Sequence, residues 1–413
     1  MVRCPTFKIN HLGLLHPITM TNTPLHLPAG FAYFGKNIGI KDSSKDLGGI
    51  LADRPCQAAA VFTRNAMPGA PIIVGRRHVA DGRLQAIIVN SKNANVATEA
   101  KGLADCERMC ALAADACGIE ADLVLPSSTG VIGKRLPMPI IEHGLNNLLE
   151  SFGKDEASLM DFARSIMTTD TRPKIISAKV GNASIIGIAK GAGMIEPNMA
   201  TMLAYFVTDA EVDSTSLQKQ LTAAVNKSFN RISIDTDTST SDTVAILANG
   251  LAGKVDADQF QQTLNELCIY LAKEIARDGE GATKLIELTV SGAASQEQAL
   301  LTAKTCINSP LVKTAIYGAD PNWGRFVMAV GKVFQYPVDI TKLIIWFGKG
   351  EGRKAINARL LDEEKVNLSE ISDLLKSNEV FVELQLGAGE FSETVWGCDL
   401  TEGYVEVNAH YTT

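Results

Sequence analysis

Short runs of apolar residues, bounded by turn-forming residues, recur along the chain and predict buried β-strands. They cover residues 58–63, 86–90, 123–125, 203–207, 285–291, 343–346, 380–385 and 404–408. Residues 174–188 form two arms on either side of Gly181 and Asn182, a dipeptide that suits the tight turn of a β-hairpin. Residues 90–95 predict a loop, and residues 231–242 predict a strand followed by a polar loop.

Apolar residues three and four positions apart mark a second kind of segment, the amphipathic helix. Such helices are predicted at residues 102–117, 137–152, 158–168, 214–229, 255–277 and 295–307. Ser214 or Ser216 is expected to cap the fourth of these helices, because a serine hydroxyl can accept a hydrogen bond from a free N–H of the first turn. Strands and helices interleave throughout, so the predicted fold class is α/β, or α+β, with layered helices and sheets.

The composition places the chain among soluble globular proteins. Of its 413 residues, 46% are hydrophobic and 21% are charged, which excludes a disordered, collagen-like or coiled-coil protein. At about 150 residues per domain, this length predicts two or three lobes. The net charge of −7 and the lack of a basic stripe argue against a nucleic-acid partner. We also find neither a signal peptide nor an apolar run of the about 18 residues that span a membrane, so we expect a cytoplasmic protein without a membrane partner.

Cysteine and histidine residues do not indicate a metal site. Cys106, Cys110 and Cys117 share one face of a predicted helix, but no histidine stands between His78 and His143 to complete a ligand set. We therefore expect these thiols to be small buried apolar groups. Residues 235–239 resemble the start of a calcium loop, but its glycine and its final glutamate are missing, so a polar turn is expected there.

Thr201 is the strongest candidate for a nucleophile. A threonine hydroxyl needs a base beside it, and the free α-amine of an N-terminal threonine supplies one. An internal threonine gains that amine only when the preceding peptide bond is cut. Ala200 and Thr201 suit such a self-cleavage, because a small residue precedes the threonine in a loop rich in Gly and Pro, just before a buried strand. Alternatively, Thr201 only opens that strand, where threonine is common.

The stretch from Lys190 to Leu203, KGAGMIEPNMATML, is similar to the processing motif of the glutamate/ornithine N-acetyltransferase family of arginine biosynthesis. Further segments occur in the order of that family, at residues 60–63, 127–133, 167–171, 278–284, 313–325 and 408–413. Together the segments span nearly the whole chain. The resemblance implies the layered fold that this family shares with the L-aminopeptidase/D-Ala-esterase family.

The resemblance also implies how the chain is processed. The Thr201 hydroxyl would attack the carbonyl of Ala200, and water would release the new ends. Residues 1–200 would then form an α chain and residues 201–413 a β chain, with Thr201 at the N-terminus of the β chain. The two chains are expected to assemble as an α2β2 heterotetramer.

Residue by residue, the resemblance implies an active site. Thr129 and Gly130 match the positions that stabilise the oxyanion, through the Thr129 hydroxyl and the Gly130 N–H. The positions that match substrate contacts are Thr168, Lys190, Thr201, Glu280, Asn408 and Thr413. We expect Lys190 to pair with the α-carboxylate of the substrate and Glu280 to meet the ammonium group of ornithine.

The implied reaction is a ping-pong transfer. N2-acetylornithine acetylates Thr201 and ornithine leaves, after which glutamate takes the acetyl group and becomes N-acetylglutamate. No metal or redox cofactor is required, and some members of the family also use acetyl-CoA as the acetyl donor. Two other functions stay open: a self-cleaving aminopeptidase that passes the acyl group to water, and an amino-acid-binding or regulatory protein on an inactive scaffold.

Three positions depart from the family pattern. Lys92 and Thr236 stand where glycine is usual, and His410 stands where an acidic residue is frequent. We expect the first two to affect loop geometry, and we expect His410 to make part of the pocket sensitive to pH.

Overall fold

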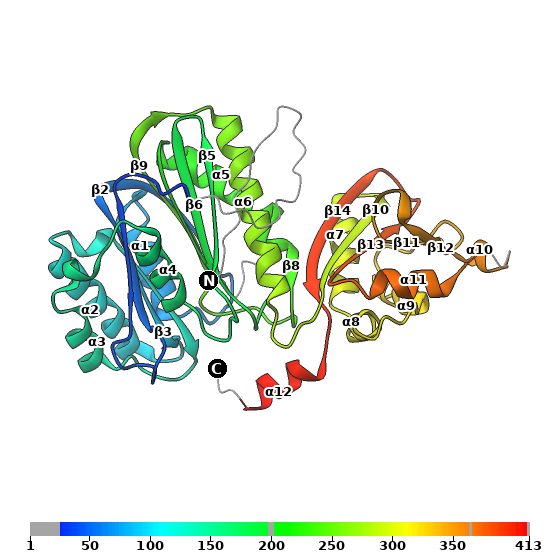
Figure 1. The fold of residues 1–413 in the computed structure, drawn as a ribbon, viewed down its shortest axis with the longest axis horizontal. Coiled ribbons are helices and arrows are strands. Elements are labelled where there is room, and N and C mark those ends of the chain that lie inside the picture. The colour runs from blue at the N-terminus through cyan, green and yellow to red at the C-terminus, as the bar shows by residue number, and fades with distance from the viewer. Residues whose placement is uncertain (1–24, 197–201, 363–365, 411–413) are drawn as a thin grey trace.

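The computed structural model describes residues 25–196, 202–362 and 366–410, which form two lobes on either side of a long helix (Figure 1). The larger lobe carries an eight-stranded sheet, and the smaller lobe carries a six-stranded sheet. Helices are layered on both sheets, which confirms the predicted α/β class with layered elements. Two lobes also fall within the predicted number.

The larger lobe is built on one sheet with the strand order β4-β3-β2-β9-β7-β6-β5 and with β1 paired to β2. Its strands are β1 (Phe31–Lys36), β2 (Leu47–Phe62), β3 (Arg83–Asn93), β4 (Val124–Val131), β5 (Lys174–Val180), β6 (Ala183–Lys190), β7 (Leu203–Glu211) and β9 (Thr243–Lys254). The long strand β2 joins the two halves of the sheet, because its first part pairs with β1 and β3 whereas residues 57–62 pair with β9. The central strands β7 and β9 are parallel to each other.

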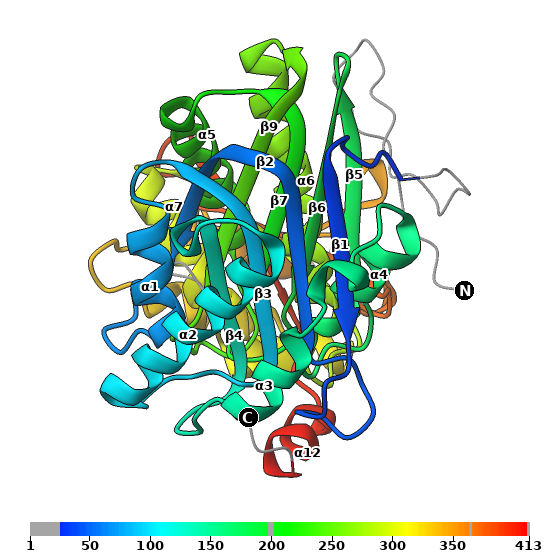
Figure 2. The same ribbon diagram turned by 90° about the vertical axis from the view of Figure 1, so that its left-hand side faces the viewer.

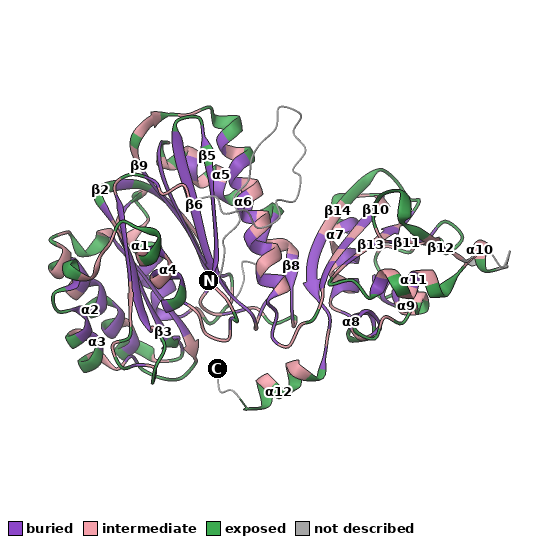
Figure 3. Ribbon diagram, in the orientation of Figure 1, coloured by how far each residue is buried: buried purple, intermediate pink, exposed green. Residues whose placement is uncertain are grey.

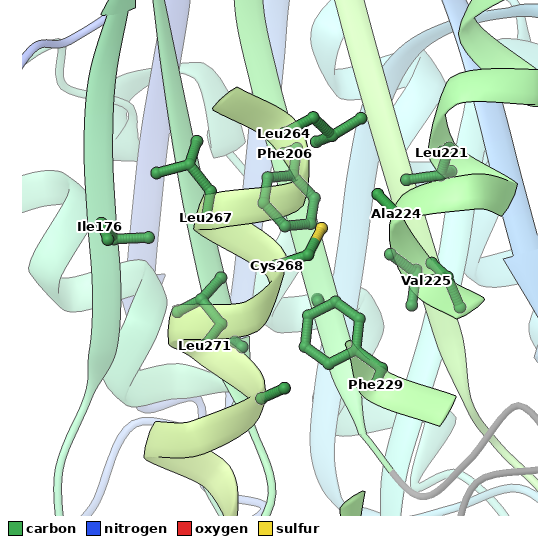
Figure 4. Close-up of a cluster of buried hydrophobic side chains, with 14 of the residues drawn as sticks. Ile176, Phe206, Leu221, Ala224, Val225, Phe229, Leu264, Leu267, Cys268 and Leu271 are labelled. Carbon is green, nitrogen blue, oxygen red and sulfur yellow. The ribbon is translucent and has the colours of Figure 1, made fainter. Parts of the chain in front are cut away.

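Helices cover both outer faces of this sheet (Figures 1 and 2). They are α1 (Ala70–His78), α2 (Glu99–Cys117), α3 (Met138–Leu145), α4 (Glu156–Ser165), α5 (Ser214–Lys227) and α6 (Ala257–Arg277). Helices α1, α2 and α3 share an apolar cluster with β3, whereas α5 and α6 share another with β5, β6, β7 and β9. Figure 4 shows Phe206 and Phe229 among the apolar side chains of α5 and α6. Each fully buried Leu or Phe side chain stabilises such a layer by about 1.5–3 kcal/mol.

The smaller lobe has the strand order β12-β11-β13-β10-β14-β8. Its strands are β8 (Ile232–Ser233), β10 (Leu285–Ala293), β11 (Ile344–Phe347), β12 (Lys354–Ile356), β13 (Glu379–Gln385) and β14 (Phe391–Cys398). Its helices are α7 (Gln296–Ile307), α8 (Pro310–Tyr317), α9 (Trp323–Gly331), α10 (Ala358–Asp362) and α11 (Leu368–Leu375). Helix α6 serves both lobes, because it contacts β5 and β6 of one sheet and β14 of the other. Figure 3 shows the buried strands at the centre of each lobe.

Most predicted strands and helices are confirmed, and most of their ends shift by a few residues. The largest of these differences is β2, which begins at Leu47 instead of at residue 58. The hairpin at residues 174–188 is formed by β5 and β6, with Gly181 at φ 57° in the turn. The predicted N-cap residue of α5 is wrong. Asp213, rather than Ser214 or Ser216, caps this helix, because its carboxylate accepts the N–H of Ser216 at 3.0 Å.

Two other boundaries were predicted wrongly. The helix expected at residues 137–152 ends at Leu145, because the extended Asn146 and the left-handed Asn147 interrupt it before a short 3-10 turn. The loop expected at residues 90–95 is largely strand, since β3 continues beside β4 and the ladder between them favours an extended backbone. Strands β9, β12 and β14 and helices α1, α8, α9, α10 and α11 had no predicted counterpart.

Residues 404–408 lie in helix α12 (Glu402–His410), not in the predicted strand. Their alternating apolar and polar side chains are typical of a half-buried strand, but no residue of α12 is buried (Figure 3). Within the described chain, residues 402–410 pair with no strand. Their backbone N–H and C=O groups therefore have to form hydrogen bonds within the segment, as they do in a helix. The Asn408 side chain adds a hydrogen bond to the carbonyl oxygen of Tyr404 at 3.0 Å, which suits a helix.

Candidate active site

A cavity of about 120 Å³ lies where the ends of β4 and β6 approach α12 and several loops. Its walls include these residues predicted for the site: Thr129, Gly130, Thr168, Lys190, Glu280 and Asn408. They come from β4, β6, α12 and the loops that follow α4 and α6. The fold therefore gathers residues that are distant in sequence, whereas their chemical roles stay predictions.

The remaining predicted site residues lie outside the described residues: Ala200, Thr201 and Thr413. Met202, the residue after Thr201, donates its N–H to Asp242 Oδ1 at 2.9 Å. Leu203 follows and pairs with Lys190 in the ladder between β7 and β6. Leu203 thus lies directly beside Lys190, which lines the cavity.

Thr129 and Gly130 stand near the end of β4, the edge strand of the larger sheet. Gly130 has φ 122°, and a Cβ there would lie 2.3 Å from the backbone carbonyl of Lys92 on β3. Glycine is therefore required for the close approach of these two strands. Thr129 is buried, with 7% of its surface exposed, and its hydroxyl has no hydrogen-bond partner among the residues that the structure describes. This hydroxyl is available to a ligand in the cavity.

The two departures from glycine occur at backbone positions that favour glycine. Lys92 has φ 89° and Thr236 has φ 70°, both in the left-handed region. Holding a residue with a Cβ there costs about 1–3 kcal/mol. The Lys92 ammonium donates to the Ile40 carbonyl at 2.7 Å, and neither side chain lines the cavity. His410 is exposed at the end of α12 and does not line the cavity either, so the expected pH effect of this residue has no support in the geometry.

Lys190, the last residue of β6, brings a buried positive charge to the cavity. Only 5% of its surface is exposed, and its Nζ donates to Thr168 Oγ1 at 3.3 Å. Burial lowers the pKa of Lys190, while the nearby charges of Asp170 and Asp242 act in the opposite direction. Within the described part of the chain, no carboxylate forms an ion pair with this ammonium. A buried ammonium group without a direct ion pair is costly, so the cavity favours an anionic ligand beside Lys190.

Negative charge reaches the cavity from the loops after α6 and β8. The Glu280 carboxylate accepts a hydrogen bond from the Asn408 amide at 2.8 Å, which ties α12 to the loop after α6. A Cβ at Gly193 would lie 2.3 Å from this carboxyl group, so glycine is needed for the close packing. Asp235 accepts two backbone N–H groups of the loop after β6, at 2.6 and 2.7 Å. The cavity therefore carries charges of both signs, as binding of an amino acid requires.

Asp242 is a cavity neighbour that sequence reasoning missed. Its Oδ1 accepts the N–H of Met202, whereas its Oδ2 is buried without a hydrogen-bond partner among the described residues. Burial raises the pKa of this carboxyl well above its usual range, against the effects of the Met202 N–H and the Lys190 ammonium. Asp242 stands in a run of Asp, Thr and Ser that is typical of a solvated loop, so no signal in the sequence marked it. Tyr404 was missed as a cavity residue because its segment was expected to be a strand.

The described residues show neither a metal site nor a membrane-spanning helix, and their cysteines are free thiols. There, no group of three or more His, Cys, Asp or Glu side chains is arranged to hold a metal ion. No helix in the same ranges has both the length and the apolar character needed to cross a bilayer. Cys106 and Cys110 are buried on α2, as expected, whereas Cys117 is only partly buried, and all the described cysteines are free thiols.

Similar sequences extend along nearly the whole chain. The ArgJ family matches residues 32–413. The chain is 49% identical over 390 residues to the arginine biosynthesis bifunctional protein ArgJ 2 of Clostridium acetobutylicum, which covers 94% of this chain and 98% of that protein. It is 42% identical over 396 residues to the glutamate N-acetyltransferase Oat2 of Streptomyces clavuligerus, with 95% and 100% covered.

Solved structures with related sequences also match part of the chain. The ornithine acetyltransferase of Mycobacterium tuberculosis, solved in complex with ornithine, is 34% identical, covers 42% of this chain and 95% of that chain, and has a TM-score of 0.39. The arginine biosynthesis bifunctional protein of Bacillus halodurans is 36% identical, with 41% and 91% covered and a TM-score of 0.36. With TM-scores this low, the relationship rests on the sequence matches.

Proposed function

The chain belongs to the ArgJ family, which confirms the resemblance of its motifs, and we propose that it transfers the acetyl group of N2-acetylornithine to glutamate. The names of the relatives, glutamate N-acetyltransferase among them, support this reaction. One observation carries the proposal furthest. The buried ammonium of Lys190 forms no ion pair with a carboxylate of the described chain, and Lys190 pairs in the ladder between β6 and β7 with Leu203, two residues after Thr201.

Thr201 is the nucleophile of the proposed reaction, and its α-amine is the base. The Thr201 hydroxyl attacks the acetyl carbonyl, and its proton passes through the amine to the departing α-nitrogen of ornithine. The C–N bond of the amide breaks, and the acetyl group stays on Thr201 as an ester. The α-amine of glutamate then attacks this ester, the C–O bond breaks, and Thr201 recovers its proton as N-acetylglutamate leaves.

The cavity residues orient the substrate and stabilise the developing charge. Thr129 and Gly130 donate to the acetyl oxygen, which becomes negative at each attack. This role is supported by the Thr129 hydroxyl, which has no hydrogen-bond partner among the described residues. Lys190 binds the α-carboxylate that ornithine and glutamate have in common. Glu280 meets the ornithine ammonium, and Asn408 holds the Glu280 carboxylate in place. Thr168 and Thr413 complete the proposed substrate contacts.

Self-cleavage between Ala200 and Thr201 precedes this reaction in our proposal, since Thr201 needs a free amine. It yields an α chain of residues 1–200 and a β chain of residues 201–413, which assemble as an α2β2 heterotetramer. The free thiols of the described cysteines support a reducing compartment such as the cytoplasm. The reaction itself needs no metal or redox cofactor.

The first prediction concerns the acceptor of the acetyl group. With N2-acetylornithine and glutamate together, the protein is expected to form ornithine and N-acetylglutamate in equal amounts, measured by mass spectrometry. Without glutamate, ornithine release should stop at about one equivalent per active site, because the acetyl-enzyme has no acceptor. Continuous acetate release without glutamate would contradict the proposal and favour the aminopeptidase alternative. The ArgJ relatives and their names give no support to that alternative.

A second acetyl donor is part of the proposal. Relatives are named bifunctional, which supports a further activity, and we assign to it the synthesis of N-acetylglutamate from acetyl-CoA. The same assay tests this assignment when acetyl-CoA replaces N2-acetylornithine.

Replacing Lys190 by methionine is the second prediction. Methionine has a similar length but no charge, so the substrate carboxylate loses one charge-assisted hydrogen bond, worth about 1.5–3 kcal/mol. KM for N2-acetylornithine and for glutamate should rise by about tenfold to a hundredfold. A matched control is Lys376→Met, because Lys376 is exposed and pairs only with Asp373 at 2.8 Å in the described chain. An unchanged KM for Lys190→Met would remove Lys190 from carboxylate binding.

A further inference from the structure

A buried ion network lies directly behind the cavity. Lys174, the first residue of β5, has a completely buried side chain, and its Nζ lies 2.7 Å from Asp170 Oδ1 and 2.6 Å from Asp278 Oδ2. The two aspartate side chains are equally secluded, with 0% and 2% of their surface exposed. One ammonium group therefore stands between two carboxylates, all out of contact with water. Such a cluster is costly to bury and does not by itself argue for stability.

Each carboxylate of this network holds a segment that carries a proposed substrate contact. Asp170 Oδ2 accepts the N–H of Thr168 at 3.1 Å. Asp170 Oδ1 accepts the N–H of the residue that follows Lys190, at 2.6 Å. Asp278 stands just before Glu280 in the loop after α6. The network thus joins three separate segments at the points where they enter the cavity.

Asp170 is the member of the network whose charge acts on Lys190 in the cavity. Burial alone would raise its pKa, but the ammonium groups of Lys174 and Lys190 bring the pKa to about 2, so Asp170 is ionised at neutral pH. Both of its oxygens are already engaged by Lys174 and by two backbone N–H groups. Lys190 is close enough to interact with this carboxylate, yet it forms no ion pair with any carboxylate that the structure describes.

If Lys174 were lost, Asp278 and Asp170 would keep different cationic neighbours. Asp278 would keep a cationic neighbour, since Arg172 Nη1 lies 3.9 Å from it. For Asp170, Lys190 would be the strongest remaining electrostatic partner. The Lys190 ammonium would then be drawn to a fixed protein carboxylate instead of a substrate carboxylate.

We propose that Lys174 is a positioning residue of the acetyl-transfer site. By engaging Asp170, it keeps the Lys190 ammonium available to the substrate carboxylate. The inference rests on the proposed function, because that function gives Lys190 a substrate carboxylate as its partner.

The test compares the steady-state kinetics of the cleaved wild-type protein with those of Lys174→Met. KM for N2-acetylornithine and for glutamate is expected to rise by about tenfold or more, with a much smaller change in kcat, because binding rather than the reacting centre is affected. The control is Lys273→Met, which removes an ion pair of α6 with Glu287 at 3.0 Å outside the cavity. This control should lower Tm at most and leave KM unchanged.

A double variant separates positioning from mere structural support. Asp170→Asn together with Lys174→Met removes the competing carboxylate as well, so Lys190 is free again, and KM should return to within about threefold of the wild-type value. A purely structural role predicts a double variant no better than Lys174→Met. Should Lys174→Met alone not fold, the double variant decides: a KM near the wild-type value supports the inference, and one raised about tenfold overturns it.

The two proposals fail in different ways. A wild-type protein that does not transfer acetyl groups to glutamate would refute the proposed function, and the role of Lys174 would fall with it. A wild-type protein that does so, beside a folded Lys174→Met variant whose KM stays within about twofold of it, would refute only the role of Lys174.

Discussion

Replacing Thr201 by alanine is expected to leave the 44.2 kDa chain uncut and without acetyl-transfer activity. Alanine has no hydroxyl to attack the Ala200 carbonyl, and an uncut chain has no free α-amine at position 201 to act as base. On a denaturing gel, the wild-type protein should give two bands of about half the mass of the chain, and the variant should give one. N-terminal sequencing of the wild-type bands should find one chain that begins with Thr201.

A control threonine shows whether the effect is specific. Thr222 lies on α5, where its hydroxyl donates to the carbonyl of Gln218 at 2.8 Å, away from the cavity. Thr222→Ala should therefore be cut and active. Cleavage of Thr201→Ala at the usual bond would exclude the Thr201 hydroxyl as the group that cuts the chain. A wild-type chain that stays in one piece would favour the amino-acid-binding alternative.

Replacing Thr129 by valine is expected to lower kcat by about 10²–10³-fold, the usual cost of one oxyanion donor, about 2.7–4 kcal/mol. Valine keeps the shape of the side chain and its preference for a strand, so β4 should remain intact. KM should change little, because the donor acts on charge that develops only during the attack. Steady-state kinetics at saturating glutamate measure the effect.

Ser128→Ala provides a control on the same strand. The Ser128 hydroxyl donates to Asn90 Oδ1 at 2.6 Å in the interior, and Ser128 does not line the cavity. Its loss should lower Tm, because a buried hydrogen bond disappears, while kcat stays near the wild-type value. If Thr129→Val loses as little activity as Ser128→Ala, the Thr129 hydroxyl does not stabilise the oxyanion.

The elements that sequence predicted best are those with local signals. The hairpin of β5 and β6 can be predicted because two apolar arms and a Gly-Asn turn occur within seventeen residues. Helix α12 shows the limit of such signals, because the period-2 pattern at residues 404–408 depends on a neighbouring strand that the described fold does not supply there. Whether such a segment forms a strand or a helix is decided by its tertiary contacts.

In the candidate site, too, residues with a local sequence signal could be predicted, and contacts made only by the tertiary fold could not. Its motif residues could be located because each stands in a short recognisable segment, as Lys190 does. The contact between Lys174 and Asp278 spans 104 positions, and nothing in either segment indicates the other. Asp242 likewise becomes a cavity neighbour only when β9 aligns beside β7. Pairings of this kind follow from strand order, which composition and periodicity do not determine.

The strand order of the larger sheet also interleaves strands from before and after the proposed cut. β7 and β9, which follow the proposed cut, lie between β2 and β6, which precede it. While the chain is whole, each half meets the other at the high effective concentration that a covalent link provides. After the cut, a denatured molecule would have to rebuild the middle of its sheet through a bimolecular search. The proposed cleavage would therefore leave a mature protein that does not readily refold once it has been denatured.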